Sequence, residues 1–359
     1  MNRTTRHGVI AALMCILLSP LAGYAYEKDE CLGWDRAWDG NSARLRASKI
    51  GFPAGYWRDA LTEAVNEWNK NPSNFHFNLT YNEDGVGRGN FQSEVWWKDD
   101  LDAPAVTYTW TTCPFGNVIV ESDIVFRTTT AYTASHNKGD LTPYGGGGRP
   151  FQNTAMHEMG HALGLMHEND EYNIMGQDWD HIHANGGSAH GYAGEDAGDG
   201  AVDLYGNDNS TNDLAVVHWR WTGASGEYST HDRTRVFSNT GAVLPTVTVN
   251  GEPHFRVSRG QQVRLELTYE NNGSSTRNGV ETRYYLSTND YISTWDRHLG
   301  TASWNLGRNN VYTTTVNLTI PNDLTVGQNY WLGAIIDPAN TLPEVNEANN
   351  ATYVGIRVQ

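Results

Sequence analysis

The eleven residues HEMGHALGLMH, from His157 to His167, include several side chains that can bind a metal ion and use it. On a helix, His157 and His161 are four residues apart, so their imidazoles project from one face and can reach one ion. Gly164 accepts a positive φ at no steric cost, so the chain can turn there and bring His167 back to the same ion. Three neutral imidazoles leave the fourth position of a tetrahedral zinc open to water. The spacing therefore predicts one catalytic Zn²⁺ on these three histidines.

Glu158 follows the first histidine and is the candidate catalytic base. Zinc lowers the pKa of a bound water toward neutrality, and a carboxylate beside that water can take its proton. The water would then attack a peptide carbonyl polarised by the metal, and Glu158 would pass the proton to the leaving amine. The competing interpretation is a surface helix that carries histidines without any role in binding.

The histidine motif is followed, eight positions after His167, by Met175 in the segment Tyr172-Asn173-Ile174-Met175. A zinc motif with such a methionine turn resembles the metzincin peptidases. The resemblance implies an α+β catalytic domain, with a twisted mixed sheet and an active-site helix above the cleft and an irregular lobe below it. It also implies that Met175 forms an apolar floor beneath the metal, and that substrate lies extended along an edge strand.

Within the metzincins, the chain resembles the matrixins and their bacterial relatives over roughly residues 40 to 206. The short spacing to Met175, the segment GNVIVESDIVF around Asp123-Ile124, and the segment EDAGDGAVDLYG are similar to that family. Three features depart from the resemblance. Glu168 stands where matrixins usually carry Ser, and Gln177 stands where astacins and serralysins would place a tyrosine ligand. A matrixin propeptide with its cysteine motif is also missing, so the sequence does not predict how activity is kept latent.

Several periodic runs would position this site. Apolar residues at helical spacing predict a helix over 53–69, and a second helix near 151–163 ends at Gly164. A short helix is expected near 196–205, whereas 139–149 reads as a flexible glycine-rich loop and 175–193 is polar without any period. Strand-like runs are expected at 75–81, 106–111 and 118–126.

Residues 244–359 resemble the CARDB module, an all-β sandwich of the immunoglobulin-like type. The resemblance rests on YYLSTNDYISTWD, on TIPNDLTVGQNYWLGAIIDPAN and on EVNEANNA, and apolar runs at 263–269, 282–286, 312–320 and 330–336 have strand character. Such modules act as spacers, surface attachments, or binders of glycans and proteins. We therefore expect a signal peptide at 1–25, a peptidase domain at 26–206, an extension or linker of uncertain assignment at 207–243, and the sandwich at 244–359.

The first 25 residues resemble an export signal. Arg3 and Arg6 precede an apolar run of about ten residues, too short to span a bilayer, and small residues precede a cut expected after Ala25. Cys15 would suggest a lipoprotein only if a small residue preceded it. The two remaining cysteines, Cys31 and Cys113, predict one disulfide in an exported chain. A rival interpretation has the Cys31 thiolate masking the zinc. The formal net charge of −16 argues against a nucleic-acid partner.

Other side chains are weaker candidates for binding ions. A second metal or a substrate could contact His181, His183 and His190, and a structural ion could use His136 and Asp140. Calcium could bind the Asp- and Asn-rich run at 207–213, or the carboxylates of the sandwich, although turn chemistry explains these residues equally well. The carboxylates in question are Asp290, Asp296, Glu344 and Glu347.

The sequence as a whole predicts a secreted, monomeric bacterial zinc endopeptidase that cleaves extracellular or host proteins. One alternative is a secreted adhesin that keeps a metzincin scaffold without catalysis. Retention of all three histidines and of Glu158 argues against that alternative. Another alternative is a zinc amidase that acts on cell-wall peptides.

Overall fold

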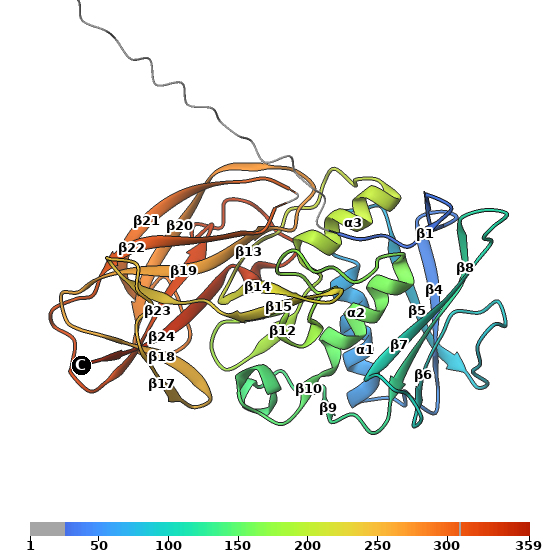
Figure 1. Cartoon of the computed structure of the whole chain (residues 1–359), viewed down its shortest axis with the longest axis horizontal. Helices are drawn as coiled ribbons and strands as arrows, with labels where there is room; N and C mark the ends of the chain where they lie inside the picture. Colours follow the sequence, from blue (N-terminus) through green and yellow to red (C-terminus); the bar gives the residue numbers. More distant parts are fainter. Residues whose placement is uncertain (1–25, 309) are drawn as a thin grey trace, which may run out of the picture.

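The computed structural model describes residues 26–308 and 310–359, and the expected signal peptide lies outside the described residues. The chain forms two bodies that lie side by side (Figure 1). The first contains all three α-helices and a six-stranded sheet, and the second is a sandwich of strands. This arrangement confirms the expected fold class, a catalytic domain of helices and a mixed sheet followed by an all-β sandwich.

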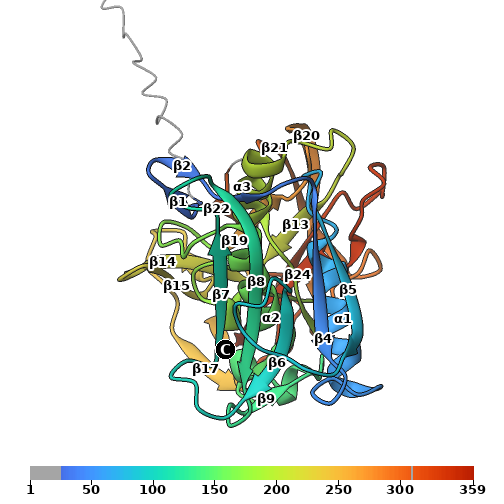
Figure 2. The same cartoon turned by 90° about the vertical axis from the view of Figure 1, so that its right-hand side faces the viewer.

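The sheet of the first body has the strand order β3-β8-β6-β4-β5, with β7 on the outer side of β8. Strands β3, β8, β6, β4 and β5 are parallel to their neighbours, whereas β7 runs antiparallel to β8 (Figure 2). The bounds are β3 Ala37–Trp38, β4 Ser42–Ser48, β5 His76–Glu83, β6 Glu94–Lys98, β7 Ala105–Thr111 and β8 Val118–Arg127. Strand β7 is therefore an edge strand with one side free to meet another extended chain.

Two helices pack against this sheet. Helix α1 (Tyr56–Trp68) buries Leu61, Ala64, Val65 and Trp68, which recur at helical spacing as expected. Helix α2 (Phe151–Leu163) is buried along almost its whole length, with only His161 half-buried among its residues. Both helices join the sheet in one hydrophobic core. The active-site helix is thus held rigidly between the sheet and the rest of the body.

The remaining part of the first body is irregular, as the resemblance implied. The stretch expected to be a flexible loop folds into two 3-10 turns, where Gly146 and Gly148 pack closely on the backbone of Asp140. The polar stretch after Met175 contains a third such turn and a short hairpin. The bounds are η1 Lys138–Asp140, η2 Thr142–Tyr144, η3 Asp178–Asp180, β9 Tyr132–Thr133, β10 Arg149–Pro150, β11 Ile182–Ala184, β12 Ala189–Gly191 and α3 Glu195–Tyr205.

The second body packs a six-stranded sheet, β17-β18-β24-β23-β20-β21, on a four-stranded sheet in which β19 pairs with β13, β16 and β22. A single apolar core fills the space between the sheets. The bounds are β17 Thr246–Val249, β18 Glu252–Val257, β19 Gln262–Asn271, β20 Arg277–Ser287, β21 Arg297–Leu306, β22 Tyr312–Thr319, β23 Asn329–Ile336 and β24 Ala351–Val358, with the turn η4 at Glu347–Asn349.

The segment of uncertain assignment, 207–243, contributes strands to the second body. Strands β13 (Leu214–Val217) and β16 (Val236–Ser238) both pair with β19, and their apolar side chains join the core of the sandwich. Between them, β14 (Trp219–Ser225) and β15 (Tyr228–Arg233) form a separate hairpin that points toward α2 (Figure 1). Residues on both sides of this hairpin are therefore fixed by the sandwich, while its tip reaches the first body.

The two bodies share a buried interface. An apolar cluster joins Tyr144, Tyr172 and Tyr192 of the first body to Tyr285 and Tyr353 of the second. At its edge the side chain of Lys138 is only 8% exposed, and its ammonium lies 2.9 Å from Glu252 Oε1 and 2.6 Å from Asp290 Oδ2. An apolar interface with a buried ion pair favours a fixed arrangement of the two bodies.

Cys31 and Cys113 form the predicted disulfide, so the thiolate-masking interpretation of Cys31 is wrong. The disulfide ties the short hairpin of β1 (Glu30–Cys31) and β2 (Trp34–Asp35) to the turn between β7 and β8. Among the described residues, none of the helices has the length and apolar character needed to cross a membrane.

Candidate active site

The three histidines of the sequence motif converge on one point. His157, His161 and His167 each offer a ring nitrogen, and these atoms lie within 4.8 Å of one another. The Nε2 atoms of His161 and His167 are 3.0 Å apart. Two nitrogens bound to a tetrahedral zinc are separated by about 3.3 Å, since each Zn–N bond is about 2.0–2.1 Å long. The spacing of the rings therefore suits a zinc ion with small adjustments of the side chains.

The Nδ1 atoms of the two helical histidines are already engaged. His157 Nδ1–H donates to the carbonyl oxygen of Ile174 at 2.7 Å, and His161 Nδ1–H donates to that of Leu165 at 2.8 Å. Metal-binding histidines usually donate their second nitrogen in this way, because the bond fixes both tautomer and ring orientation. Burial and the neighbouring histidines also hold the pKa of His161 well below its usual range, which favours the neutral, ligating imidazole.

Two glycines allow this arrangement. Gly164 ends α2 with φ +119, and a Cβ there would lie 2.6 Å from the carbonyl oxygen of Arg36, so the turn toward His167 depends on glycine. Gly160 faces the Met-turn, where a Cβ would lie 2.3 Å from Met175 Sδ. Met175 is buried directly against the turn of α2 that separates the two helical histidines. The role of Met175 as a floor beneath a bound metal stays a prediction.

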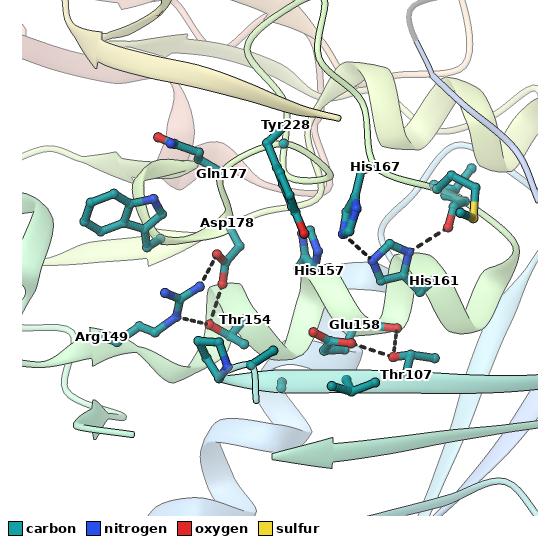
Figure 3. A pocket seen from close by; sticks show the side chains of 18 of the residues that line it. Thr107, Arg149, Thr154, His157, Glu158, His161, His167, Gln177, Asp178 and Tyr228 are labelled. Atoms are coloured by element: carbon teal, nitrogen blue, oxygen red, sulfur yellow. Dashed lines mark hydrogen bonds and ion pairs between the residues drawn. The ribbon is translucent and has the colours of Figure 1, made fainter. Parts of the chain in front are cut away.

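Glu158 lies in the same cleft as the histidines (Figure 3). The Thr107 hydroxyl can donate to Glu158 Oε2 at 2.7 Å or to the Glu158 carbonyl at 2.9 Å, so the carboxylate is oriented by strand β7. Its side chain is buried, and burial raises its pKa despite the lowering effects of His157 and Thr107. A carboxylate that is held in place and easier to protonate than usual is suited to act as a general base.

The cleft has a volume of about 730 Å³. Residues 103–107 and Thr109, on and just before β7, form one wall, and 176–179 form the opposite wall. Helix α2 supplies His157 and His161, and the segment after it supplies His167. Arg149 also lines the cleft, where its guanidinium pairs with Asp178, while Arg149 and Asp178 both bond to Thr154 (Figure 3). Burial raises the pKa of Asp178, but the charges of Arg149 and His157 and the hydrogen bonds from Thr154 and Arg149 together outweigh it, so the pKa lies below its usual value.

The tip of the β14–β15 hairpin also reaches the site, which the sequence did not indicate. Tyr228 packs its ring on His167, with 4.2 Å between the ring centroids, and its hydroxyl points into the cleft toward His157 and Glu158 (Figure 3). Glu227 Oε1 lies 3.2 Å from His167 Nδ1, so the third histidine also has a partner for its second nitrogen. These residues belong to the extension of uncertain assignment, 207–243, and no sequence motif there indicates a functional site.

The hairpin is fastened to the turn around Met175. The Ser229 N–H donates to the carbonyl oxygen of Glu168 at 2.9 Å, and His231 Nδ1 lies 2.8 Å from Asp180 Oδ1. Gly176 packs so closely on Ser229 that a Cβ would lie 1.6 Å from its hydroxyl oxygen. The position of Tyr228 is thus fixed by contacts with the peptidase body itself.

The other sequence candidates lie outside the three-histidine cluster. Glu168 accepts the N–H groups of Asn169 and Asp170 and stabilises the turn after the third histidine. Gln177 lines the cleft (Figure 3). His181 is buried between Tyr172 and Tyr192, and His183 hydrogen-bonds to the Ala351 carbonyl. The pairing of His136 with Asp140 expected from the sequence is not seen. Asp140 accepts a hydrogen bond from Ser135, whereas His136 and His190 both face Glu63.

The four sandwich carboxylates considered for calcium have other partners. Asp290 pairs with Lys138, and Asp296 accepts the backbone N–H of Ser293. Glu344 and Glu347 both accept from the Asn350 side chain. In the described part of the chain, only two groups of three or more His, Cys, Asp or Glu side chains bring their ligand atoms within 4.8 Å of one another, and neither includes these residues. Calcium binding is therefore not shown.

The fold and the three-histidine cluster define a metallopeptidase, and the donor set implies zinc. Comparison with family models gives the family: the Matrixin model matches residues 44–190, and the CARDB model matches residues 244–354. The chain therefore contains a matrixin metallopeptidase domain followed by a CARDB domain. Both resemblances inferred from the sequence are confirmed. The Tyr228 hairpin lies outside both matched ranges.

Among solved structures, the chain is similar to the CARDB domain of a Pyrococcus furiosus protein solved in complex with di-metal ions. It is 18% identical, with 42% of this chain and 90% of that chain covered and a TM-score of 0.26. OgpA from Akkermansia muciniphila is 9% identical, with 91% of this chain and 95% of that chain covered and a TM-score of 0.25. The search of curated proteins gives no significant match.

Proposed function

We propose that this protein is a secreted zinc endopeptidase that cleaves extracellular or host proteins. The observation that carries the proposal is the convergence of three imidazoles beside Glu158 in an open cleft. His157, His161 and His167 would hold the metal through Nε2, because each Nδ1 already has an acceptor. Zinc, when bound there, would acidify a water and polarise the scissile carbonyl.

The edge strand supports an extended substrate. Strand β7 pairs with β8 on one side only, and its residues line the cleft opposite residues 176–179. A peptide could therefore add to β7 through backbone hydrogen bonds, with its side chains alternating between the cleft and solvent. The cleft is open along this strand, so cleavage within a chain is favoured over trimming of its ends.

Glu158 would act as the general base. Thr107 holds one carboxylate oxygen at 2.7 Å, which leaves the other oxygen to accept a proton from the attacking water. The same oxygen would then pass that proton to the nitrogen of the departing amine. Thr107 belongs to β7, so the strand that would bind the substrate also orients the base.

Tyr228 would donate a hydrogen bond to the substrate carbonyl oxygen as negative charge develops on it. Its hydroxyl points into the cleft, and its pKa is raised by burial and by Glu227 and Glu158, which keeps it protonated. Loss of one such donor costs about 10²- to 10³-fold in kcat. We therefore expect Tyr228→Phe to lower kcat by about 10²-fold with unchanged zinc content and little change in KM. Tyr291→Phe, at an exposed tyrosine of the second body, is the control. Equal kcat values for Tyr228→Phe and wild type would contradict this role.

Secretion is supported by the disulfide, since such bonds persist in oxidising compartments. Together with the export signal expected from the sequence, it supports substrates that lie outside the cell. The CARDB domain would attach the enzyme to a cell surface, a glycan or a protein.

Metal removal tests the proposal. Casein or gelatin is incubated with the protein as purified, after zinc removal by a chelator, and after one equivalent of zinc is returned. We expect hydrolysis to disappear with the metal and to return with zinc, because the proposed chemistry needs both the ion and its three ligands. Hydrolysis that persists in fully zinc-free protein would contradict the mechanism. Absence of hydrolysis at full zinc occupancy would favour the non-catalytic adhesin.

A further inference from the structure

A second cluster of side chains that could hold a metal ion lies outside the cleft. Glu63 comes from the middle of α1, His136 from the segment before η1, and His190 from β12. Their ligand atoms lie within 4.8 Å of one another. None of them belongs to the cleft around His157.

The three side chains face one another closely. His136 Nε2 lies 2.8 Å from Glu63 Oε2, and His190 Nδ1 lies 3.6 Å from Glu63 Oε1. The two imidazole rings are stacked, with 4.1 Å between their centroids and 19° between their planes. Two stacked imidazoles that share one carboxylate repel each other if both are charged. When at most one is protonated, the other is neutral and has a nitrogen lone pair that can bind a metal ion. A divalent cation would engage all three groups at once.

The backbone fixes the two histidines before any ion binds. The Ala189 N–H donates to the His136 carbonyl oxygen at 2.8 Å, and His136 Nδ1–H donates to the Ala189 carbonyl oxygen at 3.1 Å. The second of these bonds orients His136 with Nε2 toward Glu63, in the manner of the hydrogen bonds that orient metal-binding histidines. His190 is the next residue after Ala189, so the same contact sets its position.

We propose that Glu63, His136 and His190 form a second site for a divalent transition-metal ion, with zinc as its natural occupant. Two imidazole nitrogens and one carboxylate oxygen are a donor set that zinc accepts, with water completing the coordination. Side-chain exposures of 31–46% leave room for that water and for exchange of the ion. The 2.8 Å contact would open by about 0.5 Å to reach the ligand spacing of tetrahedral zinc.

An ion at this site would connect three elements that pack around the active-site helix. Glu63 lies on α1, next to the core residues Ala60 and Ala64. The Gly191 N–H of β12 donates to Gln152 of α2 at 2.9 Å. The site would thus join α1, β12 and the chain before η1 on the surface behind α2.

Zinc stoichiometry of the full-length mature protein tests the site. Each variant is dialysed to equilibrium against micromolar free zinc and analysed for zinc per chain by mass spectrometry. We expect the His136→Ala/His190→Ala variant to hold one ion fewer than wild type. His161→Ala should lose a different ion and keep this one. His76→Ala, which removes an exposed histidine of the same body, should match wild type.

Glu63→Gln is the variant least expected to disturb folding, because it keeps the size and hydrogen-bonding capacity of the side chain. We expect it to weaken binding of the same ion at least tenfold while the circular dichroism spectrum stays unchanged. The proposal is overturned if the double-histidine variant binds as many zinc ions as wild type. It is also overturned if wild type holds only one ion and that ion is lost in His161→Ala. Neither result depends on peptidase activity.

Discussion

Replacement of Glu158 by Gln is expected to lower kcat for peptide hydrolysis by about 10²- to 10⁴-fold, the range for loss of a general base. The amide keeps the shape of the side chain and can still accept the Thr107 hydroxyl, which lies 2.7 Å from Glu158 Oε2. It cannot take a proton from water. Glu158 makes no contact with the Nδ1 partners of the histidines, so zinc affinity should change little. The measurement is kcat on a fluorogenic peptide together with zinc content.

Glu67→Gln is the matched control for this substitution. Glu67 lies on α1, where its carboxylate pairs with Lys70, and it has no contact with the cleft. We expect wild-type kcat for this variant. If Glu158→Gln retains more than a tenth of wild-type kcat at full zinc occupancy, Glu158 is not the base.

The second large effect is expected at Lys138, which connects the two bodies. Its ammonium is buried and lies within 3 Å of two carboxylates, from Glu252 and Asp290. Removing one partner from a buried ion pair costs about 3–5 kcal/mol, because the remaining charge is left uncompensated. Lys138→Met should therefore lower the free energy of unfolding by roughly this amount and lower Tm by several degrees. Glu252 keeps Arg233 at 3.1 Å, so Asp290 should account for most of the loss.

Lys70→Met provides the comparison for the Lys138 variant. Lys70, just past the end of α1, makes a more exposed ion pair with Glu67, three residues earlier in the chain. Such surface pairs contribute about 0–1 kcal/mol. Thermal unfolding of both variants and of wild type is the measurement. Similar Tm values for Lys138→Met and Lys70→Met would mean that the buried ion pair does not hold the bodies together. Adding Asp290→Asn to Lys138→Met should recover part of the lost stability.

The sequence predicted the parts of the site that lie close together along the chain. His157 and His161 are one helical turn apart, Gly164 ends that helix in the left-handed conformation, and His167 follows within three residues. Their geometry is therefore set by local rules of helix spacing and glycine conformation. The disulfide between Cys31 and Cys113 was predictable for a different reason, since only two cysteines remain after the expected cut.

The parts that sequence reasoning missed depend on contacts between distant segments. Tyr228 reaches His167 only because Ser229 packs on Gly176 and His231 pairs with Asp180. No residue type or spacing within 214–237 encodes those contacts. The same holds for His136 and His190, because the sequence suggested different partners for each of them. A backbone pairing at Ala189 brings them together at Glu63, on the helix that the spacing of apolar residues predicts at 53–69.

The central claim is that this cleft hydrolyses peptide bonds within protein chains. The most direct test is to incubate a denatured protein mixture with the zinc-loaded enzyme in ¹⁸O-labelled water and to identify new termini by mass spectrometry. We expect new internal termini in pairs, with ¹⁸O in each new carboxyl group, and none with protein that lacks zinc. Absence of new termini at full zinc occupancy, or equal numbers with and without zinc, would contradict it.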